Sequence, residues 1–318
     1  AEITGRPVTI SGSRLYDSTT TASSSILTIT SGVSGESLSL TGSGVLGAAS
    51  AGTQTITNNN TLAIADGSGG LASNYTLSGA TINVTIIPRT LNVTLSREYD
   101  GTTAVSGASL TPTFDSLQGG ETLALSGTGS VSTANVGSSK AVSLGSIALV
   151  AGSGNPSNYS LNSATMNVTQ RVINLDGIRA YDATTNVLSS DINTFGNIVS
   201  GETLTISGTG SVGTNSVAMN KAITIGSLSL GNGSGLASNY TLTGGTHTFD
   251  ISPVSVNVTG SRQYNGTNFI DSSDLLLTNL LTGETVSLSG QGTVVSADVG
   301  ANKTVTSVNL ALTGANSG

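Results

Sequence analysis

The sequence predicts an all-β protein built as a tandem array of small β-sandwich-like domains. Two observations predict this class. Apolar residues alternate with Ser, Thr or Asn in short runs, and a set of tyrosine motifs recurs at a nearly constant interval along the chain. Alternation with a period of two turns one face of each run toward a core and the other toward water, as in a β-strand. Each repeat is long enough to fold as a separate domain.

Several short runs show the strand pattern clearly. Residues 91–95 and 254–258 carry an apolar side chain at every second position, and glycine-rich turns such as Gly127-Thr128-Gly129 separate such runs. Thr and Val, which are abundant here, resist helix formation because their χ1 angles are stiff. We therefore expect roughly seven or eight short strands in each repeat and no helix.

Four sequence marks define the repeats. The first is an arginine followed two positions later by a tyrosine, and its copies are almost evenly spaced along the chain. The second is Asn-Tyr-[Ser/Thr]-Leu, the third is a glutamate after glycine, and the fourth is a lysine at a fixed interval after that glutamate. In that order the marks are Arg14/Tyr16, Arg97/Tyr99, Arg179/Tyr181 and Arg262/Tyr264; Tyr75, Tyr159 and Tyr240; Glu36, Glu121, Glu202 and Glu284; and Lys140, Lys221 and Lys303.

These marks predict four repeats, at residues 1–87, 88–170, 171–252 and 253–318. No Gly/Ser-rich linker lies between them, and Pro88 and Pro253 each fix a backbone φ angle at a junction. We therefore expect each repeat to abut its neighbours stiffly, so that the chain forms an elongated rod and the neighbouring repeats are its main partners.

The fourth repeat is expected to be incomplete at its C-terminal end. Lys140 and Lys221 precede their Asn-Tyr motifs by the same interval, and the corresponding motif after Lys303 would fall beyond Gly318. Two interpretations stay open. The natural protein continues past this point, or identical chains complete one another by strand addition and form a fibre.

Composition argues against several classes of function. Only 8% of residues are charged, and 10 Lys and Arg against 17 Asp and Glu leave a net charge of −7. No basic stripe could neutralise phosphates, so we expect no nucleic-acid partner. No apolar run is long enough for a transmembrane helix, so we expect no membrane insertion. With no cysteine and a single histidine, His247, expected to face solvent on a strand, we expect no cofactor, no resident metal and no enzymatic activity.

The tyrosine motif itself is expected to be a structural turn. The aspartate should cap the backbone two residues on, and the tyrosine should bury its ring and give its hydroxyl to a partner. A weaker alternative makes Asp17, Asp100 and Asp182 calcium ligands, although a calcium site needs about six oxygens and each motif offers one carboxylate. An ion pair between the recurring glutamate and lysine is a further expectation for repeats 2 to 4.

The segment Arg97-Glu98-Tyr99-Asp100-Gly101-Thr102-Thr103 resembles the signature of YDG-type modules. These are similar to the mostly-β, glycine-rich repeats of large bacterial surface proteins of the filamentous-haemagglutinin type. The resemblance implies a repeated stalk in a secreted adhesin, at the bacterial cell surface or in the biofilm matrix. The alternative is a carbohydrate- or receptor-binding module, with a host surface or a matrix polysaccharide as its ligand.

Overall fold

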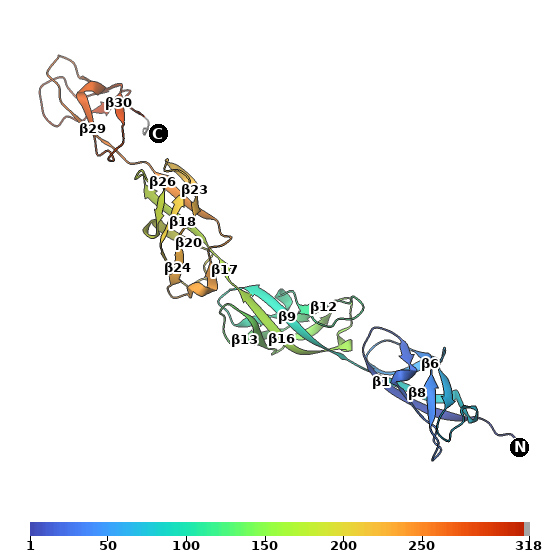
Figure 1. Cartoon of the computed structure of the whole chain (residues 1–318). Coiled ribbons are helices and arrows are strands. Elements are labelled where there is room, and N and C mark those ends of the chain that lie inside the picture. Colours follow the sequence, from blue (N-terminus) through green and yellow to red (C-terminus); the bar gives the residue numbers. More distant parts are fainter. Residues whose placement is uncertain (315–318) are drawn as a thin grey trace. The chain divides into compact units, whose positions relative to one another are not determined.

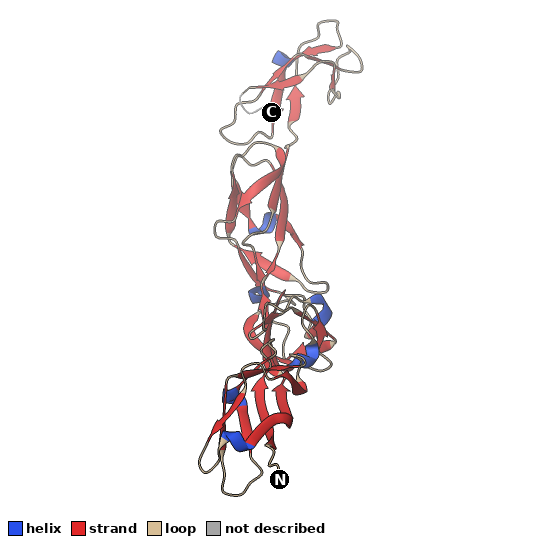
Figure 2. Cartoon of the chain, turned by 90° about the vertical axis from the view of Figure 1, so that its right-hand side faces the viewer, coloured by secondary structure: helices blue, strands red, loops and turns tan. Residues whose placement is uncertain are grey.

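A computed structural model describes residues 1–314; its regular elements are strands and short helical turns, joined by loops (Figure 2). Within these residues, no helix is long and apolar enough to cross a membrane. The helical turns are 3₁₀ turns of three residues each: η1 (Ser24–Ile26), η2 (Ala72–Asn74), η3 (Gly107–Ser109), η4 (Pro156–Asn158), η5 (Ser189–Asp191), η6 (Ala237–Asn239) and η7 (Ser272–Asp274). The predicted all-β class with tandem repeated domains is confirmed.

The first three repeats carry the same series of strands. Repeat 1 contains β1 (Arg6–Leu15), β2 (Thr21–Ser23), β3 (Leu27–Thr30), β4 (Leu38–Thr41), β5 (Ser43–Leu46), β6 (Gly52–Asn58), β7 (Ala63–Asp66) and β8 (Tyr75–Ile87). Repeat 2 contains β9 (Arg89–Glu98), β10 (Ala104–Ser106), β11 (Thr113–Phe114), β12 (Leu123–Ser126), β13 (Thr128–Val131), β14 (Gly137–Ser143), β15 (Ala148–Ala151) and β16 (Tyr159–Thr169).

In repeat 3 the first and last strands are each broken in two, so ten segments replace eight. They are β17 (Arg171–Val172), β18 (Asn174–Ala180), β19 (Asn186–Leu188), β20 (Ile192–Gly196), β21 (Leu204–Ser207), β22 (Thr209–Val212), β23 (Ala218–Thr224), β24 (Ser229–Asn232), β25 (Tyr240–Thr241) and β26 (His247–Ser252). Repeat 4 has β27 (Asn257–Gly260), β28 (Phe269–Asp271), β29 (Leu275–Thr278), β30 (Ser287–Ser289), β31 (Gln291–Thr293), β32 (Thr306–Ser307) and β33 (Ala311–Thr313).

One sheet order recurs in the first three repeats. The main sheets run β2-β5-β6-β8-β1-β3, β10-β13-β14-β16-β9-β11 and β19-β22-β23-β26-β18-β20. In each, the last strand lies at the centre and pairs in parallel with the first, as β16 does with β9 (Figure 1). Parallel pairing brings the C-terminal ends of the first and last strands to the same end of the repeat.

A single strand joins the two halves of each main sheet. The first part of β6 pairs with β8 and its last part pairs with β5, and β14 and β23 are shared between two neighbours in the same way. Strands that change partners along their length make the corners of bent sheets. The bend lets one sheet enclose much of its own core.

A two-stranded sheet forms a smaller second layer in each repeat, and in repeat 1 it consists of β4 and β7. Leu38 and Leu40 of β4 and Ile64 of β7 pack against a buried cluster that contains Val8 and Ile10 of β1. Val8 and Ile10 are two residues apart on one face, as the period-two pattern predicts, and both are buried. The core is therefore small and made mainly of aliphatic side chains.

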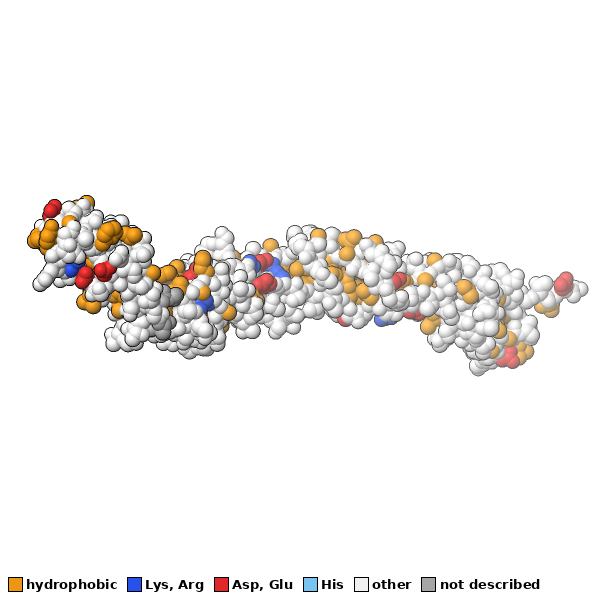
Figure 3. All heavy atoms as spheres, turned by 90° about the horizontal axis from the view of Figure 1, so that it is seen from above, with side chains coloured by type: hydrophobic (Ala, Val, Ile, Leu, Met, Phe, Trp, Pro, Cys, Tyr) orange, Lys and Arg blue, Asp and Glu red, His pale blue; other side chains and the backbone are white. Residues whose placement is uncertain are grey.

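The chain divides into two compact units, Ala1–Thr169 and Gln170–Gly318, and each unit holds two of the predicted repeats. In the first unit only Pro88 separates β8 from β9. Residues 315–318, the end of the predicted fourth repeat, lie outside the described residues. Charged side chains are sparse and scattered on the face drawn in Figure 3, in keeping with the composition.

Candidate functional site: the tyrosine turns and the junctions between repeats

The tyrosine motif forms the same turn in every repeat. In repeat 2, Asp100 accepts hydrogen bonds from the Thr102 amide at 2.9 Å and from the Thr102 hydroxyl at 3.0 Å. Repeats 1 and 3 repeat these contacts with Asp17 and Asp182, and repeat 4 repeats them with Asn265. A side-chain oxygen that caps the amide two residues on is an Asx turn, as the sequence predicts.

The third residue of each turn adopts a left-handed backbone conformation. Its φ angle is 63° at Ser18, 76° at Gly101, 66° at Ala183 and 76° at Gly266. Only glycine adopts this conformation without a steric cost. Ser18 and Ala183 adopt the same conformation as the glycines, so the turn keeps its shape in repeats 1 and 3 at a steric cost.

The motif arginine locks this turn. Arg97 lies 3.1 Å from the Asp100 carboxylate and also donates hydrogen bonds to the carbonyls of Thr102 and Ala104. Arg179 makes the same set of contacts with Asp182, Thr184 and Asn186. The arginine side chains in these ion pairs are about nine-tenths buried, so the guanidinium serves mainly to fix the backbone of the turn.

Each of the aspartates considered for calcium is engaged inside its own turn. Arg14 pairs with Asp17, and the three candidates Asp17, Asp100 and Asp182 lie in three different repeats. Burial disfavours the charged form of Asp17, but hydrogen bonds from the Thr19 amide, Arg14 and the Thr19 hydroxyl outweigh it and lower the pKa of the carboxyl. In residues 1–314, no three Asp, Glu or His side chains are grouped as a metal site would need.

The motif tyrosine lies at the end of its repeat where the last strand of that repeat also ends. The amide of Tyr16 donates to the carbonyl of Ile87, the last residue of β8, at 2.9 Å. Tyr99 and Tyr181 make the corresponding bonds to Thr169 and Ser252. The position follows from the parallel pairing of the first and last strands, because both strands end where the following repeat begins.

A glutamate of repeat 2 joins two tyrosines, one from each repeat. Tyr16 donates its hydroxyl hydrogen bond to Glu121 Oε1 at 2.5 Å, and Tyr159 donates to Glu121 Oε2 at 2.6 Å. The two rings meet edge to face, with centroids 5.3 Å apart at 76°. The Gln118 amide donates to the Tyr159 hydroxyl at 3.1 Å, so both the carboxylate and the tyrosines are held in place. We call Tyr16, Glu121 and Tyr159 the junction triad.

Further contacts surround the junction triad. Arg89 Nε donates to the carbonyl of Tyr16 at 3.0 Å, and Asn158 accepts from the Ala51 amide at 2.8 Å. One buried cluster contains Tyr16, Leu46, Val84 and Ile86 of repeat 1 together with Leu91, Leu123 and Tyr159 of repeat 2. The apolar core therefore continues across the junction.

Burial and the carboxylate both keep the triad tyrosines protonated. Burial, followed by the hydrogen bond to Glu121, raises the pKa of Tyr16 from its ordinary value of 10.0 to about 12. The same two causes, in the same order, raise the pKa of Tyr159. A protonated phenol can donate to Glu121, whereas a phenolate would be repelled by it.

The second unit contains the same link. Tyr181 of repeat 3 donates to Glu284 of repeat 4. Inside their own repeats, Tyr75 donates to Glu36 and Tyr240 donates to Glu202, the latter at 2.7 Å. The recurring glutamate is thus the acceptor for tyrosines of both motifs.

Three expectations drawn from the sequence are wrong. The recurring lysine does not pair with the glutamate: Lys140, Lys221 and Lys303 instead donate to backbone carbonyls or hydroxyls five and seven residues before them. A lysine that closes its own loop in this way leaves the glutamate to the tyrosines. The error arose because a constant separation along the sequence does not require contact.

His247 does not face solvent. It is 8% exposed, its Nδ1 accepts from the Leu175 amide at 3.1 Å, and its Nε2 lies 2.9 Å from the Leu242 carbonyl. Since Nδ1 accepts a hydrogen bond, Nε2 carries the proton and donates. The imidazole thus satisfies two backbone groups where β18 meets β26.

The expectation that every motif tyrosine is buried is also wrong. Tyr16 and Tyr99 are 3% and 4% exposed, and Tyr181 is half-buried, but Tyr264 is 66% exposed. The link between a motif tyrosine and the glutamate of the following repeat was missed altogether. Tyr16 and Glu121 are 105 residues apart, and the only signal for the link was that both residues recur with the same period.

Comparison with known protein families agrees with the repeat pattern. The model of the YDG domain matches the chain four times, at residues 2–83, 85–166, 168–248 and 251–318. No curated protein matches the chain. Because the four matches together cover nearly the whole sequence, the chain belongs to the YDG domain family and consists of four consecutive copies of that domain.

Proposed function

We propose that this chain is a non-catalytic structural spacer, a stalk segment in which YDG domains are fastened to one another in pairs, repeat 1 to repeat 2 and repeat 3 to repeat 4. The observation that carries the proposal is the junction triad, because it holds one repeat against its neighbour through buried, directional contacts. Hydrogen bonds to a charged acceptor are each worth about 1.5–3 kcal/mol, more than typical neutral ones. The buried cluster shared by repeats 1 and 2 adds apolar burial to these bonds.

The setting of this spacer is a large secreted bacterial protein of the adhesin type, at the cell surface or in the biofilm matrix. The sequence resemblance supports this setting. A repetitive chain with few charges and a hydroxyl-rich surface also suits a role that needs length more than chemistry. In this role the partners of each domain are its neighbouring domains.

The carbohydrate-binding alternative needs aromatic rings at the surface. The rings of Tyr75, Tyr159 and Tyr240 are at most 8% exposed, the exposed rings of Tyr264 and Phe269 both lie in repeat 4, and the chain contains no Trp. This favours the spacer over a sugar-binding platform. A glycan array probed with the intact chain separates the two functions, since a spacer should bind no glycan selectively.

The spacer function is tested most simply by measuring how freely repeat 2 moves against repeat 1. The chain has no cysteine, so spin labels can be placed cleanly at Thr41→Cys and Ser143→Cys, both exposed strand positions. We expect a narrow distribution of distances in double electron–electron resonance, and a broader one once Glu121→Ala removes the shared acceptor. A distribution that is already broad in the parent chain would contradict a stiff spacer.

A further inference from the structure

Asparagine is followed by glycine at two places in this chain, Asn232-Gly233 and Asn265-Gly266. Asparagine is a chemically labile residue, and a glycine after it leaves the next backbone amide unhindered by a Cβ atom. That amide can attack the side-chain carbonyl of the asparagine and expel ammonia. Both pairs are exposed, so water reaches them. These are therefore the two positions where the sequence most favours spontaneous deamidation.

The aspartate of the tyrosine turn is replaced by asparagine in repeat 4 alone. Asn265 accepts hydrogen bonds from the Thr267 amide at 3.1 Å and from the Thr267 hydroxyl at 3.0 Å, just as the aspartates accept them in the other turns. The aspartate side chains of those three turns are 39–44% exposed, so the turn is open to water in each of these repeats. The turn therefore accepts either residue, and it holds the side-chain carbonyl of Asn265 in a fixed place.

The amide of Gly266 is available as the nucleophile. Among residues 1–314 it makes no hydrogen bond, and a Cβ built on Gly266 would meet no other part of the chain within 4 Å. Gly233, in contrast, donates its amide to the Gly235 carbonyl at 3.1 Å, and Asn232 pairs with Leu204 at the end of β24. The same dipeptide is thus restrained in repeat 3 and unrestrained in repeat 4.

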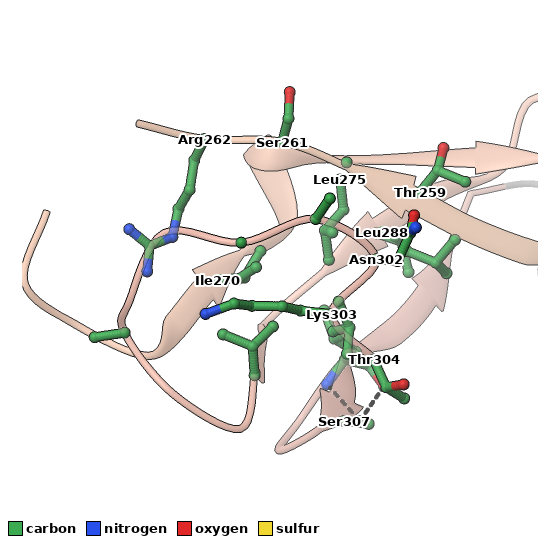
Figure 4. A pocket seen from close by; sticks show the side chains of 18 of the residues that line it. Thr259, Ser261, Arg262, Ile270, Leu275, Leu288, Asn302, Lys303, Thr304 and Ser307 are labelled. Carbon is green, nitrogen blue, oxygen red and sulfur yellow. Dashed lines mark hydrogen bonds between the residues drawn. The ribbon is translucent and has the colours of Figure 1, made fainter. Parts of the chain in front are cut away.

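Arg262 places positive charge on the carbonyl that is attacked. Its guanidinium donates a hydrogen bond to Asn265 Oδ1. Arg262 and Lys303 both line one pocket, and their charged ends extend toward the same side of it in Figure 4. A cation bonded to a carbonyl oxygen stabilises the negative charge that develops on that oxygen during attack. Asn232 Oδ1 instead accepts from the neutral amide of Ala237 at 2.8 Å, which is a weaker donor.

We propose that Asn265 is a site of spontaneous deamidation, which converts the turn of repeat 4 into the aspartate form found in the other repeats. The Gly266 nitrogen forms a bond with Asn265 Cγ, the bond from Cγ to Nδ2 breaks, and Nδ2 leaves as ammonia with the proton of the Gly266 amide. One water molecule then opens the cyclic imide. Opening at Cγ gives aspartate, and opening at the backbone carbonyl gives isoaspartate.

Peptide mapping by mass spectrometry measures both asparagines in the intact chain during incubation at mildly alkaline pH. Each conversion adds about 1 Da. We expect Asn265 to convert about tenfold faster than Asn232 in the folded chain, because of its unrestrained glycine amide and its charged donor. In concentrated urea the two rates should become equal, since both sites are then Asn-Gly pairs in an unfolded chain. No preference for Asn265 in the folded chain, or a preference that persists in urea, would overturn the proposal.

Gly266→Ala is the matched control, because alanine stands at this position in repeat 3, where Ala183 has a φ of 66°. The added Cβ hinders the attack without meeting another part of the chain. We expect Asn265 to convert about tenfold more slowly in this variant, while Asn232 keeps its parent rate. An unchanged rate at Asn265 would rule out the Gly266 amide as the nucleophile.

Asn265→Asp tests whether the aspartate product suits the turn. We expect this variant to unfold at the same temperature as the parent chain or a higher one, because Arg262 then meets a carboxylate, as Arg97 meets Asp100 at 3.1 Å. A lower unfolding temperature would contradict the assignment of aspartate as the product that the turn accepts. These measurements are independent of the spacer function.

Discussion

At the scale of single residues, the molecule repeats one turn and tolerates imperfect residues in it. The Asx turn keeps the same hydrogen bonds around Ser18, Gly101, Ala183 and Gly266, all with positive φ. In each repeat the arginine contacts the Asp or Asn side chain of the turn and the carbonyl two residues after it. A non-glycine residue in the left-handed region costs about 1–2 kcal/mol. The arginine and aspartate contacts offset this cost in repeats 1 and 3, since the turn there is unchanged.

This strain predicts opposite effects for two exchanges. Ala183→Gly should stabilise repeat 3 by about 0.5–1 kcal/mol, because relief of the steric cost exceeds the added entropy of the unfolded chain. Gly101→Ala should destabilise repeat 2 by about 1 kcal/mol. Thermal unfolding of the two variants beside the parent chain measures both. Shifts of the same sign in both variants would show that backbone strain does not govern these positions.

The raised pKa of Tyr16 predicts a loss of stability at alkaline pH. In the folded protein this pKa is about 12, above the ordinary 10.0, so the folded state holds its proton more tightly than the unfolded state does. The contribution of this proton to the free energy of unfolding is complete below pH 10, and it is lost as the pH rises from 10 to 12. The loss should amount to about 2–3 kcal/mol.

The alkaline effect is measured by chemical unfolding of the chain between pH 9 and pH 12. Tyr16→Phe is the matched variant, because it keeps the ring and removes the titrating hydroxyl. Its stability should fall less steeply over this range than that of the parent chain. Identical slopes would mean that Tyr16 titrates normally in the folded state.

At the scale of elements, the central strand of each of the first three repeats is the one on which the sheet depends. Met166 of β16 is fully buried between β9 and β14. We expect Met166→Ala to cost about 2–5 kcal/mol, like other large-to-small changes in a core. Ser160→Ala in the same strand, at an exposed position, should change stability by less than about 0.5 kcal/mol. Urea unfolding measures the loss of stability in both variants. Comparable losses in the two would contradict a central core role for β16.

The strands and turns could be predicted from the sequence because they depend on local signals. Alternation of apolar residues fixes which face of a strand is buried, and the Asp-x-Thr spacing fixes the Asx turn. The order of the strands could not be predicted, because the parallel pairing of the first strand with the last depends on residues far apart in the sequence, such as Val93 and Ala164. The role of His247 was missed for the same reason, since its partner Leu175 lies 72 residues away.

At the scale of the whole molecule, the recurring residues serve the junctions as well as the domains. A shared period indicates equivalent positions, but it does not tell whether a residue acts within its repeat or between repeats. Tyr75 and Tyr240 bond glutamates of their own repeats, whereas Tyr16 and Tyr181 bond glutamates of the next. The parallel pairing of the first and last strands decides between the two, because the first-motif tyrosine directly follows the first strand and so lies beside the end of the last strand.

The most direct test of the junction between repeats is a double-mutant cycle on Tyr16 and Glu121. Unfolding of residues 1–169, one compact unit, would be measured for the parent, Tyr16→Phe, Glu121→Gln and the double variant. Tyr264→Phe in the intact chain is the control, because its exposed hydroxyl should contribute nothing measurable. We predict a coupling energy of about 1–3 kcal/mol between Tyr16 and Glu121. Additive effects, within about 0.5 kcal/mol, would contradict a direct link between the two repeats.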